Sequence, residues 1–488
     1  MSYDIAGLAA ELADTTAGTA IATIADAGRL RNKSRDFYWY SPILREQLDH
    51  VRADLAVLPA TDAEIVRTLR ACHRRGIPVT VRGAGTGNYG QAMPLRGGVV
   101  LDLSLHDKII SIRRGMARAM AGVRLLDLDL AAQAHSGQEQ RMHPSTLRNA
   151  TLGGFVCGGS GGVGSVTWGG LRDRGNVLGA RVITMESSPQ VLELRGDDVQ
   201  QVVHAYGTTG VVTEVEIALT QAYNWIDIAV AFDDFATAAR FAHTLACQDA
   251  LLKKLVTVIA APIPQRFLRP IAALVGADRH VVLTMIADVA LPAFESLLRA
   301  WPGTLAWRGA GDAIASADGG AGGRSLLPIY EYAWNHTTLH ALKVDRNITY
   351  HQTLYPAPGH VEKAIALHRE LQGDVLHHLE FVRFDGQIAC YGLPLIAYTT
   401  PARLREIEDT FEAHGCPTFS PHTVTLEEGG MKRVDPVQLA FKREADPQGL
   451  LNPGKMLAWE QPDYDARGER VHLFPAAGDA AAKPAPAA

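Results

Sequence analysis

The sequence predicts an α+β protein with a glycine-rich first domain and a separate α/β domain. Three observations favour this class. A helix, a strand, a glycine-rich loop and another strand follow one another between residues 61 and 103. A second glycine-rich cluster occupies residues 153–162, and strands alternate with helices from residue 225 to about residue 300. Two glycine clusters in one domain predict a ligand groove, and the alternating run predicts a second sheet with helices on one face.

The first glycine-rich loop, residues 82–91, has the sequence RGAGTGNYGQ. Thr61 and Glu64 have the spacing of a capping box, and Gly76 with Pro78 closes the predicted helix. The β-branched residues 79–81 enter the loop as a strand, and residues 99–103 leave it as another. In Rossmann and P-loop proteins the glycines lead into a helix, whereas here they lead into a strand. The alternatives are a flexible surface loop and a loop that wraps a pyrophosphate with backbone amides.

The second cluster favours the pyrophosphate interpretation. Residues 144–162 read PSTLRNATLGGFVCGGSGG, and VGSVTWG follows. Glycine adopts positive φ and lets the backbone approach a ligand closely. We therefore expect the two loops to form two walls of one dinucleotide groove.

Five ordered motifs resemble those of a known superfamily: PATDAEIVRTLRACHRRGIPVTVRGAGT, TLGGFVCGGSGG, WGGLRDRGNVLGARVIT, YGTTGVVTEVEIAL and GLLNPGKM. Together they are similar to the FAD-binding module of the vanillyl-alcohol oxidase and p-cresol methylhydroxylase superfamily, nearest to the glycolate oxidase and D-2-hydroxyacid dehydrogenase group. The resemblance covers about residues 55–220 and 440–457. It implies a two-part FAD-binding domain of the p-cresol methylhydroxylase type with an α/β substrate (cap) domain.

The resemblance also implies which residues hold FAD. They are Arg82, Gly83, Ala84, Gly85, Thr86, Gly87, Asn88, Tyr89, Gln91, Pro144, Ser145, Thr146, Thr151, Gly153, Gly154, Gly159, Ser160, Gly161, Gly162, Trp168, Gly169, Val212, Asn452 and Lys455. Many members attach the flavin through a His just after the first glycines, where this chain has Gly-Thr-Gly-Asn-Tyr. Cys157 lies where bicovalent members have a Cys, but its spacing matches a small unattached residue. We therefore expect non-covalent FAD.

A base for substrate oxidation is expected from the segment WNHTTLHALK, residues 334–343. A His suits abstraction of a hydroxyl proton, and a Lys can hold a carboxylate. His336 and Lys343 are the first candidates for catalysis, and His422 is the reserve. The hydroxyacid dehydrogenases also carry a metal motif with two His and an EHG segment. Residues 377–380 and 420–423 lie near those places without the required spacing, so no metal is expected.

The resemblance implies an FAD-dependent oxidase or dehydrogenase that transfers hydride from an alcohol carbon, of a small 2-hydroxy acid in the first instance. O₂ or a carrier would reoxidise the flavin. The alternatives are oxidation of an aromatic alcohol against Tyr38, Trp39 and Trp334, or a flavoprotein subunit of a multi-component dehydrogenase. The NADPH-dependent UDP-sugar reductases share the FAD module, but their substrate half matches poorly.

Composition limits which partners and which cellular compartment can be expected. The formal net charge of −5 gives no general attraction to nucleic acid or to an anionic membrane. Five cysteines without a CxxC pair favour a reducing compartment. The N-terminus lacks a basic region before its apolar residues, and no uncharged apolar run is long enough to span a membrane. We expect a cytoplasmic protein, with a homodimer possible.

The predicted boundaries are residues 1–54 for an N-terminal extension, 55–222 for the FAD-binding domain and 223–438 for the substrate domain. Residues 439–474 should return to the FAD-binding domain. Residues 310–324 read as a loop, and residues 475–488 as a disordered tail. Helices are expected at 125–136 and 197–206, and Asp385-Gly386 predicts a type I′ hairpin.

Overall fold

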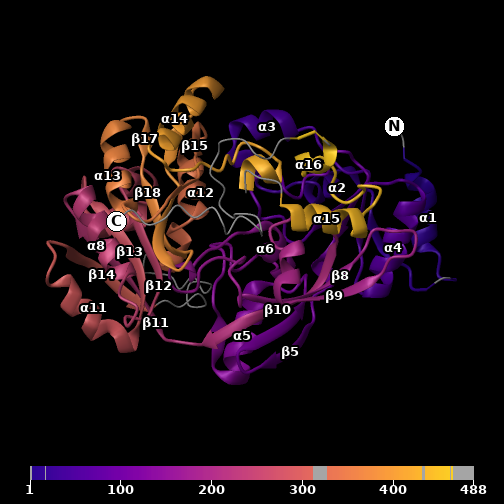
Figure 1. Ribbon diagram of the computed structural model, residues 1–488, viewed down its shortest axis with the longest axis horizontal. Coiled ribbons are helices and arrows are strands. Elements are labelled where there is room, and N and C mark those ends of the chain that lie inside the picture. The colour runs from indigo at the N-terminus through magenta and orange to yellow at the C-terminus, as the bar shows by residue number, and fades with distance from the viewer. Residues whose placement is uncertain (1–2, 17, 311–326, 431–434, 462, 465–488) are drawn as a thin grey trace.

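The computed structural model describes residues 3–16, 18–310, 327–430, 435–461 and 463–464. Figure 1 shows the strands of the first half of the chain at the lower right and those of the second half at the left. The predicted loop at 310–324 lies outside the described residues except for residue 310, and the predicted tail at 475–488 lies wholly outside them. In the described part of the chain, no helix has the length and apolar character needed to cross a membrane.

The first sheet carries the first glycine-rich loop. Its strand order is β1-β2-β4-β3, and β4 pairs in parallel with both β2 and β3. These strands are β1 (Ala22–Ile24), β2 (Leu55–Leu58), β3 (Val79–Arg82) and β4 (Val99–Asp102). Helices α1 (Ile5–Ala13), α2 (Ala27–Lys33), α3 (Pro42–Leu48) and α4 (Asp62–Arg74) belong to the same part of the chain. The predicted order of helix, strand, glycine-rich loop and strand is therefore observed.

The N-terminus of α4 confirms the cap and modifies the capping box. The Thr61 hydroxyl accepts from the Glu64 amide at 3.3 Å. The Glu64 carboxylate accepts from the Ala60 amide at 2.7 Å, one residue earlier than in a standard capping box.

The second sheet has the order β5-β6-β10-β8-β9, and β7 pairs with the end of β10. Its strands are β5 (Ile109–Arg113), β6 (Met116–Met120), β7 (Gln138–Gln140), β8 (Val177–Ile183), β9 (Val191–Arg195) and β10 (Val211–Gln221). Helices α5 (Leu125–Ser136), α6 (Leu152–Gly158) and α7 (Ser165–Trp168) accompany it. The predicted helix 125–136 ends at Gly137 with φ 62°, as expected.

The predicted helix 197–206 is wrong beyond its first turns. A short 3₁₀ helix covers Gly196–Gln201, and the chain then turns, with His204 at φ 54° and Tyr206 at φ 53°. A positive φ does not fit an α-helix of L-residues, so the chain cannot continue as one.

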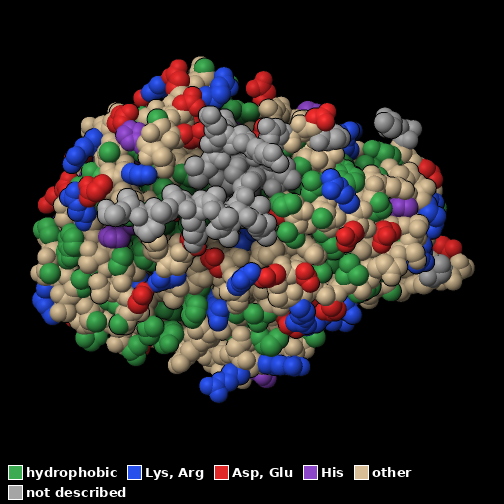
Figure 2. Space-filling view, in the orientation of Figure 1, with side chains coloured by type: hydrophobic (Ala, Val, Ile, Leu, Met, Phe, Trp, Pro, Cys, Tyr) green, Lys and Arg blue, Asp and Glu red, His purple; other side chains and the backbone are tan. Residues whose placement is uncertain are grey.

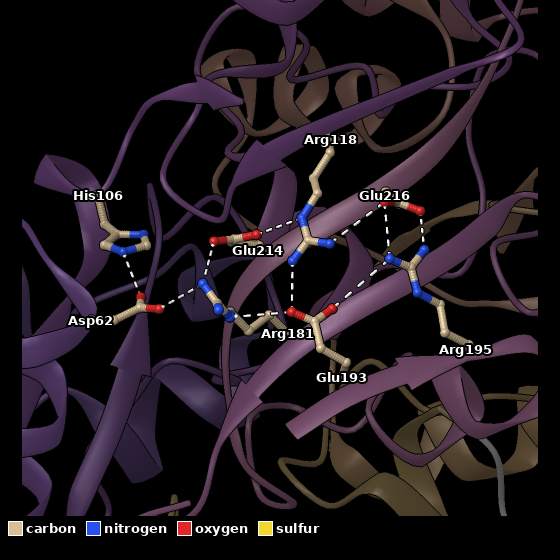
Figure 3. Close-up of polar contacts among 8 residues, drawn as sticks. All are labelled: Asp62, His106, Arg118, Arg181, Glu193, Arg195, Glu214 and Glu216. Carbon is tan, nitrogen blue, oxygen red and sulfur yellow. Dashed lines mark hydrogen bonds and ion pairs between the residues drawn. The ribbon is translucent and has the colours of Figure 1, made fainter. Parts of the chain in front are cut away.

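An ion-pair network crosses the second sheet (Figure 3). Arg118 on β6 bonds Glu214 on β10 at 2.5 Å and Glu193 on β9 at 2.8 Å. At one end Arg195 pairs with Glu216, and at the other Asp62 pairs with His106 at 3.0 Å. Arg181 joins the two parts of the network. Arg118–Glu214 and the contacts of Arg181 with Glu193 and Glu214 join adjacent strands, whereas Arg118–Glu193 and Arg195–Glu216 reach across the strands between them. The network therefore ties together β6, β10, β8 and β9 on one face of the sheet.

The third sheet has the order β14-β11-β13-β12-β18-β19-β16, and every recorded pairing is antiparallel. Its strands are β11 (Trp225–Phe232), β12 (Lys253–Ile259), β13 (His280–Ala287), β14 (Thr304–Ala310), β16 (Thr353–Tyr355), β18 (His378–Phe384) and β19 (Gln387–Gly392). Between β18 and β19, Asp385 has φ 47° and Gly386 has φ 77°, which agrees with the predicted type I′ hairpin.

Helices cover both faces of this sheet, so the predicted one-sided arrangement is wrong. Val230 on β11 belongs to the core that also contains Phe235 of α8 (Phe235–Ala246). Ala231, on the opposite face of the strand, belongs to the core with Ile271 of α10 (Arg269–Val275). Helices α11 (Leu291–Leu298) and α13 (His360–Glu370) share the first core, while α9 (Ile263–Phe267) and α12 (Asn335–Val344) share the second. Both faces of β11 are apolar, so each face is covered.

A small sheet, β15-β20-β17, completes this half with α14 (Pro401–Ala413). Its strands are β15 (Ile348–Tyr350), β17 (Val375–Leu376) and β20 (Leu395–Ala397). The chain then returns to the first sheet through α15 (Pro436–Ala445) and α16 (Leu457–Glu460), drawn in yellow at the upper right of Figure 1. The Val79 amide donates to Leu450 O and the Asn452 amide donates to Val79 O, both at 2.8 Å. On the face shown in Figure 2, basic and acidic side chains are interspersed.

Candidate active site

One large cavity lies between the two glycine-rich loops and the third sheet. From the first half of the chain it is lined by residues 81–89, 91 and 92, by parts of 144–161, by residues around 204–212, and by Asp36, Phe37, Tyr40, Leu103 and Ala121. From the second half it is lined by Trp334, Asn335, His336, Gln352, Thr353, Tyr391, Gly392, Leu393, Phe419 and Gly429. The expected groove between two glycine walls is therefore present, and the second half of the chain covers it.

The two loops touch each other where glycine is needed. A Cβ on Gly83 would collide with the Thr151 hydroxyl and lie 3.6 Å from Gly154 Cα. Gly85 has φ 67°, a conformation that side chains with a Cβ rarely adopt. The glycines therefore serve two purposes. They let the walls pack against each other, and they let the first loop turn along the cavity.

Several backbone amides in both walls have no protein partner recorded within the described part of the chain. Among the described residues, no hydrogen bond to the protein is recorded for the amides of residues 84–88 in the first wall. The same holds for the amides of Ser145, Thr146, Ser160 and Gly161 in the second wall. Amides without partners along a cavity suit an anion such as a pyrophosphate. These residues thus fit the phosphate part of a dinucleotide.

Most of the residues that the resemblance assigns to FAD line this cavity. They are Arg82, Gly83, Ala84, Gly85, Thr86, Gly87, Asn88, Tyr89, Gln91, Pro144, Ser145, Thr146, Thr151, Gly153, Gly154, Gly159, Ser160, Gly161 and Val212. Gly162, Trp168 and Gly169 do not line it. A Cβ on Gly162 would meet His143 O, and the Trp168 ring lies under the Arg141 guanidinium at 4.5 Å.

Asn452 and Lys455 lie behind the first loop, outside the cavity lining. Asn452 Nδ2 donates to Gln91 O at 2.8 Å and to Tyr206 O at 2.7 Å, and so joins two segments of the wall. Lys455 Nζ donates to Gly90 O at 2.5 Å. Burial lowers the pKa of Lys455 to about 7, while the nearby Asp36 carboxylate acts in the opposite direction. Both side chains support the loop.

His336 is the catalytic candidate that the structure places in the cavity wall. It lies in the first turn of α12, and its Nδ1 is 2.6 Å from Glu331 Oε2. An ionised carboxylate only accepts hydrogen bonds, so Nδ1 carries the proton and Nε2 has the lone pair. No protein partner of Nε2 is recorded in the described part of the chain. The arrangement is that of a general base oriented by a carboxylate.

The other two candidates lie elsewhere. Lys343 is exposed in the last turn of α12, and it does not line the cavity. His422 is buried with both ring nitrogens engaged, Nδ1 with Ser41 Oγ at 2.8 Å and Nε2 with Tyr350 O at 3.1 Å. Burial lowers its pKa to about 4, so it is neutral and fully bonded near pH 7. The structure therefore gives both side chains surroundings typical of structural residues.

The structure bears on two further expectations, a metal site and a covalent bond to the flavin. Among the residues with described positions, no group of three or more His, Cys, Asp or Glu side chains is arranged to hold a metal ion. His378 Nε2 contacts Glu380 Oε1 at 2.8 Å, and Glu380 also accepts from the Trp334 amide at 2.6 Å. Cys157 lines the cavity, and burial raises the pKa of its thiol to about 12, so it is a poor nucleophile.

Sequence reasoning missed several lining residues. Gln352 accepts from the Tyr89 hydroxyl at 2.7 Å, and Tyr391 and Phe419 add aromatic rings from the second half. From the aromatic run near the N-terminus, Phe37 and Tyr40 line the cavity, whereas Tyr38 and Trp39 do not. His204 and Tyr206 also line it. Their only sequence signal was their place directly before Gly207 in a segment that resembles the FAD module.

Comparison with known proteins identifies the class. Residues 53–192 match the family described as FAD binding domain. An uncharacterized FAD-linked oxidoreductase of Mycobacterium tuberculosis is 32% identical over 175 residues, which are 34% of this chain and 37% of the relative. The glycolate oxidase subunit GlcD of Escherichia coli K12 is 33% identical over 175 residues, 34% of each chain. A D-lactate dehydrogenase of Archaeoglobus fulgidus is 30% identical over 178 residues, 34% of this chain and 38% of the relative.

The sequence match therefore spans little more than a third of these relatives. Among solved structures, an alkyldihydroxyacetonephosphate synthase aligns with a TM-score of 0.64 over 89% of this chain and 82% of its own, at 15% identity. That likeness concerns the fold. The chain carries an FAD-binding domain, and through it is a homologue of FAD-linked oxidoreductases. The expected superfamily resemblance and the FAD cofactor are confirmed.

Proposed function

We propose that this protein is an FAD-dependent oxidoreductase that oxidises an alcohol carbon by hydride transfer to the flavin. The observation that carries the proposal is the His336–Glu331 pair in the wall of the cavity that the FAD-binding loops also line. FAD, when bound, supplies the hydride acceptor. The protein then needs a base near the substrate hydroxyl, and the imidazole is the one histidine in the second-half lining of the described chain.

The proton transfer follows from the hydrogen bond. His336 Nε2 accepts the hydroxyl proton as the carbon loses its hydride, and the ring becomes an imidazolium. The Glu331 carboxylate, which already accepts from Nδ1–H, stabilises the new charge. Arg148, from the loop next to Pro144, lies 3.9 Å from the other oxygen of Glu331. The base is thus tied to the wall built by the FAD-binding half.

A small 2-hydroxy acid is the first substrate class, supported by the names of the relatives, which include glycolate oxidase and D-lactate dehydrogenase. Such a substrate needs donors for its carboxylate. Among the described lining residues, Arg82 is the one arginine or lysine, and its guanidinium already donates to Arg35 O and Ala84 O. The second half offers neutral polar side chains, namely those of Trp334, Asn335, Gln352, Thr353 and Tyr391, of which the Thr353 hydroxyl already donates to Pro417 O.

An aromatic alcohol is the second candidate, favoured by the rings that line the second-half side of the cavity. Trp334, Tyr391 and Phe419 all belong to this lining, and the rings of Trp334 and Tyr391 lie 6.3 Å apart in a T-shaped contact. Aromatic walls of this kind suit an aryl substrate. Of the three aromatic residues expected from the sequence, only Trp334 lines the cavity.

The test is a screen of substrates with the purified holoprotein. Two panels of compounds are used, one of 2-hydroxy acids and one of aryl alcohols. Each compound is mixed with the protein under anaerobic conditions, and the loss of visible flavin absorption is recorded. Bleaching by a 2-hydroxy acid supports the first class, and bleaching by an aryl alcohol supports the second. No bleaching by either panel, in protein whose flavin is still reduced by dithionite, contradicts alcohol oxidation. Repeating a positive reaction in air then shows whether O₂ reoxidises the flavin.

We also propose that FAD is held without a covalent bond, because no His follows the first-loop glycines and the Cys157 thiol is protonated. Acid precipitation should release all of the yellow cofactor into the supernatant. Flavin that stays with the pellet contradicts this part of the proposal.

A further inference from the structure

Two residues in the cavity wall, His204 and Tyr206, have a backbone conformation that neither residue favours. Their φ angles are 54° and 53°, and they stand just before Gly207, with φ 67°. For a bulky residue such as Tyr, a positive φ is an outlier. Strained residues of this kind persist only where the surrounding structure holds them, and they cluster at ligand sites.

Three hydrogen bonds, to α6 and to Asn452, hold this segment in place. The amide of His204 donates to Val156 O and the amide of Tyr206 donates to Cys157 O, both at 2.9 Å on α6. Asn452 Nδ2 donates to Tyr206 O at 2.7 Å. The strained segment is therefore fixed to the second glycine wall and to the C-terminal return of the chain. Both side chains are buried, with 4% of each residue exposed.

The two side chains present unpaired polar atoms. His204 Nδ1 lies 2.8 Å from Gly159 O, and a carbonyl only accepts, so Nδ1 carries the hydrogen and Nε2 is an acceptor. Burial lowers the pKa of His204 to about 4, so the ring is neutral near pH 7. Among the described residues, His204 Nε2 and the Tyr206 hydroxyl are buried without a hydrogen-bond partner. The Gln91 side chain lies near this hydroxyl, but its Nε2 already donates to Gly158 O.

An acceptor and a donor therefore stand side by side, with ring centroids 5.2 Å apart. Burial keeps the pKa of Tyr206 well above its usual value, so the phenol stays protonated and can donate. Leaving two such atoms unpaired in a buried wall is costly unless a ligand pairs with them. Both belong to the FAD-binding half, next to Cys157 and Gly159, so the ligand that meets them is the cofactor.

We propose that His204 and Tyr206 bind FAD as an acceptor–donor pair, with His204 Nε2 accepting from an N–H of a heteroaromatic ring and the Tyr206 hydroxyl donating to a ring nitrogen or carbonyl of the same edge. Both the flavin and the adenine carry an edge of this kind. The proposal rests on FAD binding and not on the substrate or the reaction proposed above, so the two can fail separately.

The test measures FAD affinity in the full-length chain after removal and re-addition of the cofactor. Tyr206→Phe removes only the hydroxyl, and His204→Phe keeps a ring but removes the acceptor. Each should raise the Kd for FAD about 3- to 10-fold, the effect of losing one buried hydrogen bond. Tyr330→Phe is the matched control, because its buried hydroxyl, near the Arg148 side chain, also has no hydrogen-bond partner recorded among the described residues and lies outside the cavity lining. This variant should bind FAD like the wild type.

Two further measurements show which ring is held. If the pair binds the flavin, the variants should shift the flavin reduction potential and absorption spectrum and leave ADP binding unchanged. If it binds the adenine, ADP affinity should fall as much as FAD affinity, with an unchanged potential. Wild-type FAD affinity in both variants overturns the proposal. If His204→Phe lowers the thermal stability of the apoprotein so far that it cannot be measured, Tyr206→Phe alone decides.

Discussion

Replacing His336 removes the base without disturbing the FAD-binding loops. The substitution removes the hydrogen bond between Nδ1 and Glu331 at 2.6 Å, and it removes Nε2, for which no protein partner is recorded among the described residues. General-base catalysis contributes about 10²- to 10⁴-fold to a rate. His336→Ala should therefore keep a full complement of FAD and lose about 10²- to 10⁴-fold in the rate of flavin reduction by the substrate found in the screen.

Glu331→Gln weakens the hydrogen bond to His336 without removing the base, so a smaller loss of rate is expected. A hydrogen bond to a charged group contributes about 1.5–3 kcal/mol and one between neutral groups about 0.5–1.5 kcal/mol. The difference of about 1–1.5 kcal/mol corresponds to a loss of about 5- to 13-fold in the rate. This smaller loss should appear in the rate of flavin reduction and not in the affinity for FAD, because Glu331 acts through His336.

The assay is anaerobic stopped-flow measurement of flavin absorption, with His340→Ala as the control. His340 lies one turn further along α12, and its Nε2 contacts Glu331 O at 3.0 Å outside the cavity lining. It should reduce its flavin at nearly the wild-type rate. A stable, FAD-replete His336→Ala protein that also does so refutes the assignment of the base.

Three further predictions concern binding and stability. Gly85→Val should abolish FAD retention, because Gly85 has φ 67° in the cavity wall. Gly115→Val is the control and should keep its cofactor, because Gly115 has φ 82° in a surface turn with open space around it. Equal FAD content in the two purified proteins contradicts this prediction. A double-mutant cycle on Arg195 and Glu216 should give a coupling of about 0.5–1 kcal/mol that weakens with salt, and urea unfolding of the four proteins measures it. Burial lowers the pKa of His377 to about 3, so the unfolded chain binds a proton at this residue at a higher pH than the folded chain does. The free energy of unfolding should therefore fall as the pH drops from about 6.5 toward 3, and His377→Phe should make this fall shallower by up to about 1.4 kcal/mol per pH unit. The same slope in both proteins, measured by urea titrations between pH 7 and pH 5, refutes this prediction.

The FAD-binding loops were predictable because their determinants are local. The helix cap at Thr61, the strand before Gly83 and the positive φ of Gly85 each depend on a few neighbouring residues. The same is true of the hairpin at Asp385-Gly386, where both residues have positive φ as the dipeptide predicts. Local backbone preferences do not change with the rest of the fold, so they can be recognised from sequence motifs.

Whether a side chain lines the cavity depends on contacts with residues far away in the sequence, so only the tertiary structure could show it. His336 and His422 look equivalent as isolated histidines, yet one lines the cavity beside Glu331 and the other is bonded between Ser41 and Tyr350. Asn452, which the resemblance assigns to FAD binding, donates from behind the first loop to Gln91 O and Tyr206 O.

The sequence by itself determined the two glycine walls and their cofactor, because backbone shape and unpaired amides follow from residue type over short stretches. Only the tertiary structure decided which polar side chains line the cavity. Asn452 is 246 positions from Tyr206 in the sequence, yet the fold places it where it donates to Tyr206 O behind the cavity wall.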